Sequence, residues 1–156
     1  MAGETPIRLD RNLSYNLSLL TFLMGKASFD IYDSRELTSG QWKVLSVLAA
    51  FGPMAAVDIG KRVTLDKAAI SRAVRQLRDL KMASYRSHAV DGRSVEVVLT
   101  AKGSRTYRAA HTEMMELQAR LFEGISKDHQ RAFFTTAEKL RARLRTELLP
   151  VPEEIG

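Results

Sequence analysis

Basic residues concentrate in one stretch of the sequence, between Lys61 and Arg93. This stretch holds nine Lys and Arg residues and three Asp residues, so its net charge is +6. The whole chain of 156 residues has 24 basic and 18 acidic residues, and therefore the same net charge. A local excess of positive charge is typical of a surface that binds nucleic acid, because phosphates repeat along the nucleic-acid backbone.

The residues that follow Asp66 predict a helix with one buried face and one cationic face. Apolar residues recur at helical spacing from Ile70 to Leu80, and Asp66 can cap the first turn. The other face carries Lys67, Ala68, Ser71, Arg72 and Arg75. Small residues allow close approach to a major groove, where Arg binds guanine through two hydrogen bonds. Taken alone, the pattern also fits an ordinary amphipathic helix with a solvated charged face.

Two helices are expected before this one. Thr38 and Gln41 have the spacing of a capping box, which opens a helix that Gly52-Pro53 ends. A short helix at about 55–62 is followed by a turn of about three residues. This order is that of a helix-turn-helix. Lys61 and Arg62, at the end of the short helix, are expected to bind DNA without regard to its sequence.

After Leu80 the periodicity changes to that of strands. Residues 83–88 and 94–99 predict a hairpin, with Asp91-Gly92 in its turn. A hairpin after a helix-turn-helix forms a wing, whose tip residue Arg93 can enter a narrow minor groove. Asp91 either orients an arginine through an ion pair or only shapes the turn through hydrogen bonds to backbone amides.

Apolar seams are expected on the helices at both ends of the chain. A first helix from Leu9 carries apolar residues in steps of four and three from Leu13 to Ile31, and two long helices are expected at about 101–125 and 127–148. A second copy of the chain, or the core of a monomeric bundle, could cover these seams.

The predicted fold is therefore mainly α, a winged helix-turn-helix with six helices and a small β-hairpin. We expect a single unit over residues 1–156. Its DNA-binding region spans 37–100, and its helical dimerisation region spans 10–36 and 101–148.

Composition argues against several chemistries. The chain has no cysteine, which excludes disulfides and thiolate metal sites, and its three histidines show no ligand spacing. We find no nucleophile–base pair and no phosphate-binding glycine loop, so no catalytic residue, metal or cofactor is expected, and the protein is not predicted to be an enzyme.

The N-terminal residues lack a signal-peptide core and no apolar run could cross a membrane, so we expect a cytoplasmic protein.

Several short motifs occur together: Leu37-Thr38, Gln41-Trp42, Val44-Leu45, the Asp66–Val74 helix, Leu77, Asp91-Gly92-Arg93 and Leu99-Thr100-Ala101-Lys102-Gly103. In this order they resemble the MarR family of bacterial transcription regulators over about residues 10–148. The resemblance implies a winged-helix homodimer on a pseudo-palindromic site in double-stranded DNA. The terminal helices would form the interface, the 66–80 helix would enter the major groove, and the wing would reach the neighbouring minor groove. By position, Lys67, Ala68, Ser71, Arg72 and Arg75 would face bases or phosphates, and Asp91 would orient Arg93.

Two positions depart from the pattern of that family. Lys81 stands where members often have a left-handed glycine, so either Lys81 adopts that conformation or the turn differs. Tyr85 stands where members tend to have a basic residue, and the adjacent Arg86 should point to the other face of the strand. How the first strand contacts phosphate is therefore open.

Many members of the family release DNA when they bind a small phenolic or aromatic acid. Arg11, Tyr15, Trp42 and His111 are the candidates here for a cation, a hydroxyl and an aromatic wall. Each also has a simpler role, in the core, at an interface or on the surface. The predicted function is a sequence-specific DNA-binding repressor, less often an activator, that a small aromatic ligand releases. The alternative is an architectural or other nucleic-acid-binding protein without a ligand switch.

Overall fold

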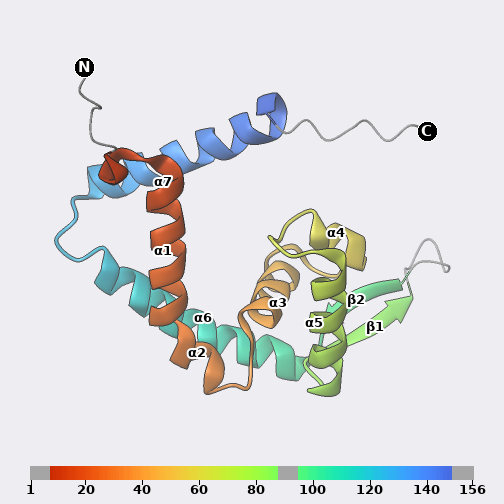
Figure 1. Ribbon diagram of the computed structural model, residues 1–156. Coiled ribbons are helices and arrows are strands. Elements are labelled where there is room, and N and C mark those ends of the chain that lie inside the picture. Colours follow the sequence, from red (N-terminus) through yellow and green to blue (C-terminus); the bar gives the residue numbers. More distant parts are fainter. Residues whose placement is uncertain (1–7, 88–94, 149–156) are drawn as a thin grey trace, which may run out of the picture. The chain divides into compact units, whose positions relative to one another are not determined.

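The computed structural model describes residues 8–87 and 95–148, which are mostly helical (Figure 1). The chain divides into two compact units, Met1–Leu117 and Gln118–Gly156. The predicted wing tip, with Asp91 and Arg93, lies outside the described residues.

The elements follow the predicted order. The first unit contains a 3-10 turn, six helices and two strands: η1 (Leu9–Arg11), α1 (Leu13–Ala27), α2 (Phe29–Asp33), α3 (Ser39–Phe51), α4 (Ala56–Gly60), α5 (Lys67–Asp79), β1 (Ala83–Ser87), β2 (Val95–Leu99) and most of α6 (Ala101–Leu121). The second unit contains the end of α6, then α7 (Lys127–Arg143) and a π-helical turn, η2 (Leu144–Leu148). The prediction of a mainly α chain with a small antiparallel hairpin is confirmed.

The predicted first helix is divided, so the described residues contain seven α-helices where six were expected. Asn12 caps α1 by accepting a hydrogen bond from the Tyr15 amide (2.9 Å), so the helix begins at Leu13 and not at Leu9. At the other end, the Ser28 hydroxyl donates to the Met24 carbonyl (2.7 Å). Such a side-chain bond to the backbone competes with the regular helix, and α2 starts one residue later.

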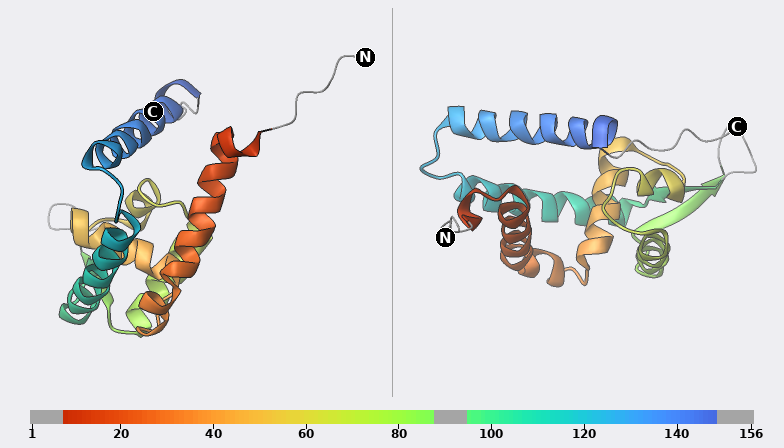
Figure 2. Two further views of the ribbon diagram at one scale, coloured as in Figure 1. Left: turned by 90° about the vertical axis from the view of Figure 1, so that its left-hand side faces the viewer. Right: turned by 45° about the horizontal axis from the view of Figure 1, so that its top comes forward.

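The core of the first unit lies between α3, α4, α5 and the hairpin. Figure 1 and the right-hand view of Figure 2, where α5 is seen end-on, show α5 alongside the strands. Tyr85 on β1 pairs with Val97 on β2, and Met54 exchanges two backbone hydrogen bonds with Val97 (2.8 and 3.3 Å). These bonds attach the α3–α4 connection to the hairpin. The largest fully buried side chains are Leu45, Ile59, Leu77, Val44, Val74 and Val97.

Both predicted helix caps are present. The Gln41 amide donates to the Thr38 hydroxyl (3.3 Å), and the Gln41 side chain accepts from the Thr38 amide (2.6 Å). The Asp66 carboxylate accepts from the Ala69 amide (2.7 Å) at the start of α5. The two helices of the helix-turn-helix region whose caps were predicted therefore begin where the sequence indicates.

The end of α5 shows that Lys81 adopts the left-handed conformation, with φ of 58°. The Lys81 amide donates to the Arg78 carbonyl (2.8 Å), and the Met82 amide donates to the Leu77 carbonyl (2.8 Å). This is the hydrogen-bond pattern of a Schellman motif. Of the two conformations open at Lys81, the chain has the one that a glycine would normally take.

The first turn of α6 binds the end of α5. The Thr100 hydroxyl donates to the Lys81 carbonyl (2.7 Å), and the Lys102 ammonium donates to the Leu80 carbonyl (2.9 Å). Gly103 is buried against the Met82 carbonyl, and a β-carbon at this position would collide with that backbone oxygen. Only glycine permits this approach without movement of the backbone.

Gly103→Ala should therefore destabilise the protein by roughly 1–3 kcal/mol or more, because a backbone group must move to admit the methyl group. Gly25→Ala in α1 is the matched control, since no atom beyond its chain neighbours and its own helix backbone lies within 4 Å of its β-carbon position. That change should raise stability by up to about 1 kcal/mol. Urea unfolding measures both variants. Equal effects at the two glycines would show that close packing at Gly103 is unimportant.

Candidate nucleic-acid interface

The exposed face of α5 carries the predicted base and phosphate contacts. Lys67, Arg72 and Arg75 are exposed, as are the small residues Ala68 and Ser71 between them. Within residues 8–87 and 95–148, none of these three cations forms an ion pair. The buried face is that predicted from the periodicity, with Ile70, Ala73, Val74 and Leu77 in the core. The helix thus presents free cations with little side-chain bulk between them.

Lys61 and Arg62 lie just after α4, and both are exposed. The Lys61 ammonium pairs with Asp58 (3.0 Å), and Arg62 donates to the Asp58 backbone carbonyl (3.1 Å). The Arg62 guanidinium also lies 5.2 Å from the centre of the Phe51 ring. These contacts hold two cations just after α4, and each already has a partner. Their contact with DNA stays a prediction.

The hairpin presents two different faces. The Arg86 guanidinium pairs with Glu96 on the neighbouring strand (2.8 Å). Tyr85 lies on the other face, and the Arg78 guanidinium is 4.2 Å from the centre of its ring. Sequence reasoning did not select Arg78. Its spacing of seven residues from Ser71 was the available signal, because it places both residues on one stripe of α5.

Three of the aromatic residues form a stack between α3 and α6. The ring centre of Tyr107 is 5.1 Å from that of Trp42 and 5.4 Å from that of His111. Trp42 and His111, both predicted ligand contacts, are thus brought together by a residue that the sequence did not single out. Arg11 and Tyr15 lie at the start of the chain's first helical segment and make no ring or cation–π contact with this stack in the described part of the chain.

A cavity of about 550 Å³ adjoins the stack at Tyr107. Four residues with polar side chains line it, Arg86, Arg108, Ser104 and Tyr107, together with the apolar residues Leu48, Ala49, Pro53, Val98 and Leu99. Among the described residues, Arg108 forms no ion pair. Cations beside an apolar wall suit an organic anion with an apolar body.

A buried hydroxyl lies on the same helix as Trp42. The Ser46 oxygen has no hydrogen-bond partner in the described structure, and Ser46 follows Trp42 by one helical turn. A buried hydroxyl without a partner is destabilising, and a bound polar molecule could satisfy it.

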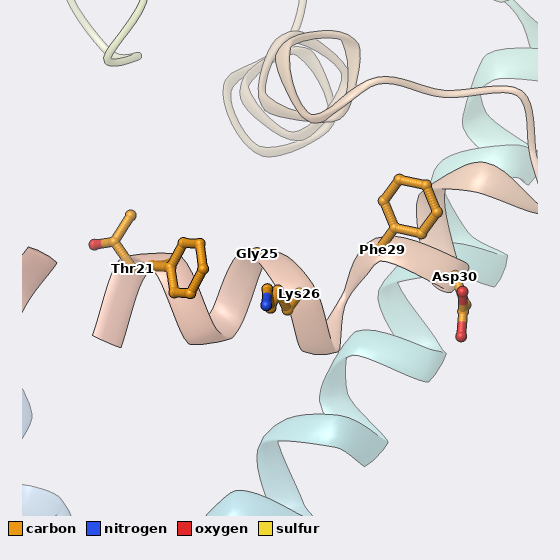
Figure 3. A pocket seen from close by; sticks show the side chains of 6 residues that line it. Thr21, Gly25, Lys26, Phe29 and Asp30 are labelled. Atoms are coloured by element: carbon orange, nitrogen blue, oxygen red, sulfur yellow. The ribbon is translucent and has the colours of Figure 1, made fainter. Parts of the chain in front are cut away.

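Another cavity, of about 530 Å³, lies at the junction of α1 and α2 (Figure 3). Thr21, Gly25 and Lys26 reach it from α1, and Phe29 and Asp30 from α2. The Lys26 ammonium is 4.8 Å from the centre of the Phe22 ring, so this cation already has a neighbour. None of the predicted contact residues lines this cavity, and we assign it no ligand.

In the described ranges, no group of three or more His, Asp or Glu residues could hold a metal ion. No helix in the same ranges is long and apolar enough to cross a membrane.

Known proteins share this fold. The sequence model of the MarR family matches residues 36–94. The structure is similar to a MarR/EmrR family transcriptional regulator from Acinetobacter sp. ADP1, which is 27% identical over 88% of this chain and 98% of that chain, with a TM-score of 0.79. A MarR family regulator from Silicibacter pomeroyi is 21% identical over 96% of this chain and 97% of its own, also with a TM-score of 0.79.

BpsR from Bordetella bronchiseptica, whose DNA binding is regulated by 6-hydroxynicotinic acid, is 20% identical over 88% of this chain and 98% of its own, with a TM-score of 0.76. No curated protein sequence matches the chain. The sequence match covers the helix-turn-helix region and β1 and ends before β2, and the structural likeness covers most of the chain. Residues 36–94 thus match the MarR family, and the described chain has the winged-helix DNA-binding fold of solved MarR-family transcriptional regulators.

Proposed function

We propose that this protein is a homodimeric transcriptional repressor that binds a pseudo-palindromic DNA site and leaves it when a small aromatic acid binds. The observation that carries the proposal is the face of α5, where Lys67, Arg72 and Arg75 are exposed and form no ion pair within the described residues. Phosphates and guanine edges are the partners that such a face fits.

The order of residues along this face supports sequence-specific binding. Ala68 and Ser71 permit close approach near the start of α5, while Arg72 and Arg75 can reach base edges or phosphates further along. Lys61 and Arg62 lie outside the helix and would contact the backbone. An architectural protein would bind random DNA nearly as well as the promoter beside its own gene. A specific repressor should prefer its site by at least about a thousandfold.

Arg72→Ala should cost roughly 1–3 kcal/mol on the specific site and relax the preference at one base pair per half-site, because a bidentate base contact is lost. Lys61→Ala is the comparison variant. It should weaken binding to all sequences alike and flatten the salt dependence. Fluorescence anisotropy with operator and random duplexes measures both. Equal losses on the two duplexes for Arg72→Ala would assign Arg72 to phosphate contact instead.

The exposed apolar surface of α1 supports a dimer. No residue of α1 is buried in the described chain, and Leu13, Leu17 and Leu20 are 54%, 49% and 50% exposed. In the second unit, Phe133 and Phe134 on α7 are also exposed. Burying one large apolar side chain contributes about 1.5–3 kcal/mol, so a second copy that covers these residues would be strongly favoured.

The double variant Leu17→Glu/Leu20→Glu should be monomeric at micromolar concentration, because it would place four carboxylates in the dimer interface. Ser18→Glu, on the polar side of the same helix, is the control and should remain dimeric. Sedimentation equilibrium gives the masses. A wild-type mass of one chain would contradict the dimer, as would a dimeric double variant. Footprinting should show two half-sites about one helical turn apart, roughly 10 bp.

The aromatic stack and its adjoining cavity support a small-molecule effector. An aromatic acid could place its ring against Trp42, Tyr107 and His111, with its carboxylate at Arg108. The cavity lies within the range of roughly 300–1,000 Å³ that is common for ligand sites. BpsR, a protein of the same fold, responds to an aromatic acid.

Aromatic acids that bind should raise the melting temperature and release DNA. When the free acid is at a hundred times its dissociation constant, the free energy of unfolding should rise by about 2.7 kcal/mol, which raises the melting temperature by several degrees. Hydroxybenzoates and 6-hydroxynicotinic acid are the probes. Arg108→Gln should lose the melting shift and the release of DNA, and it should keep its affinity for DNA. Arg105 does not line the cavity, so Arg105→Gln should keep the melting shift and the release. If no acid shifts melting or releases DNA, the ligand switch is wrong and the DNA-binding function stands separately.

A further inference from the structure

A fixed cation lies at the junction of α5 and the hairpin. Arg78 belongs to the last turn of α5, and its guanidinium carbon is 4.2 Å from the centre of the Tyr85 ring on β1. This distance is well within the range of about 6 Å for a cation–π contact. A guanidinium stacked on a ring uses its flat face, so the N–H groups at its edge remain available as donors. In the described residues Arg78 forms no ion pair.

Arg78 continues the stripe of α5 that faces the hairpin. It follows Ser71 by seven residues and Lys67 by eleven, which are close to two and three helical turns. Lys67, Ser71 and Tyr85 line one cavity of about 530 Å³ beside α4. Figure 1 and the right-hand view of Figure 2 show α5 next to the hairpin, with its axis crossing the direction of the strands. The cationic face of α5 therefore extends to the base of the wing.

The arginine of β1 has a different environment. Arg86 points to the opposite face of the hairpin and pairs with Glu96 (2.8 Å), whose side chain is only 13% exposed. The Arg86 guanidinium is therefore paired on the face of the hairpin that is turned away from α5. Arg78 supplies the cation at the α5–hairpin junction from the helix, and the Tyr85 ring limits the conformations of its side chain.

The proposed binding mode puts a DNA backbone at this junction. A helix in the major groove and a wing in the adjacent minor groove lie on either side of one sugar–phosphate strand. That strand must pass over the surface between α5 and β1. We infer that Arg78, positioned by the ring of Tyr85, binds a phosphate of that strand through charge-assisted hydrogen bonds. The inference rests on the DNA binding proposed above and assigns a contact to a residue outside the predicted set.

The salt dependence of binding tests this contact. Arg78→Ala should weaken binding to operator and random DNA alike, on the order of tenfold, because a phosphate contact carries no sequence information. The slope of log affinity against log salt should decrease by about 1.8, since each lost contact removes about 0.9 and a dimer has two. Lys139→Ala on α7 removes the same charge in the second unit and should leave the slope unchanged.

Variants of Tyr85 test the positioning role. Tyr85→Phe keeps the ring and should retain affinity within about twofold, whereas Tyr85→Leu should weaken binding several-fold on both duplexes, because the stacked guanidinium loses its support. In the double variant Arg78→Ala/Tyr85→Arg the cation moves to the strand, and the wild-type salt slope should return.

An unchanged slope for Arg78→Ala, or a loss confined to one base pair of the operator, would overturn the inference. So would a fall in melting temperature that accounts for the loss of binding. If the wild-type protein itself shows no salt-dependent DNA binding, the proposed function fails and this contact fails with it. If only the Arg78→Ala slope stays unchanged, the contact alone is wrong.

Discussion

The binding interface depends on the junction where α6 begins and α5 ends. Three carbonyls at the end of α5, those of Leu80, Lys81 and Met82, accept hydrogen bonds from the segment Thr100–Lys102. Because β2 leads directly into that segment, the same bonds fix the hairpin beside α5. The close approach at Gly103 completes the contact. A small rotation of α5 here would move its cationic face away from the wing, so the geometry of both proposed groove contacts is set at this point.

Charge pairing differs between the contacts that join neighbouring elements and the exposed face of α5. Arg35 pairs with Glu113, and Arg86 pairs with Glu96, joining α6 to the segment after α2 and one strand to the other. Along α5, by contrast, the cations have no carboxylate partners in the described residues. Pairing satisfies an arginine locally and reduces its attraction for phosphate. The cations of α5 thus remain available on the surface where we propose DNA binding.

Local interactions made much of this structure predictable. The capping residues Thr38 and Asp66 act within a single turn, and the apolar stripe of α5 reflects helical periodicity, so the sequence alone placed these helices. The break at Ser28 was missed, because the seam of apolar residues continues through it while the hydroxyl competes for a backbone carbonyl. Contacts between elements were not predictable. The Arg78–Tyr85 contact and the place of Tyr107 in the stack depend on how α5 lies on the hairpin and how α3 crosses α6.

Lysine at position 81 has a consequence for how freely this turn can change in evolution. A left-handed conformation costs a residue with a β-carbon about 1–2 kcal/mol. Two effects oppose that cost: a cation near a helix C-terminus contributes about 0.3–1 kcal/mol, and the unfolded chain has less entropy with lysine than with glycine, worth about 0.4–1 kcal/mol. Together these two contributions nearly cancel the cost of the left-handed conformation. Lysine and glycine are therefore close to neutral alternatives for folding here, and surface charge beside the DNA can decide between them without loss of the turn.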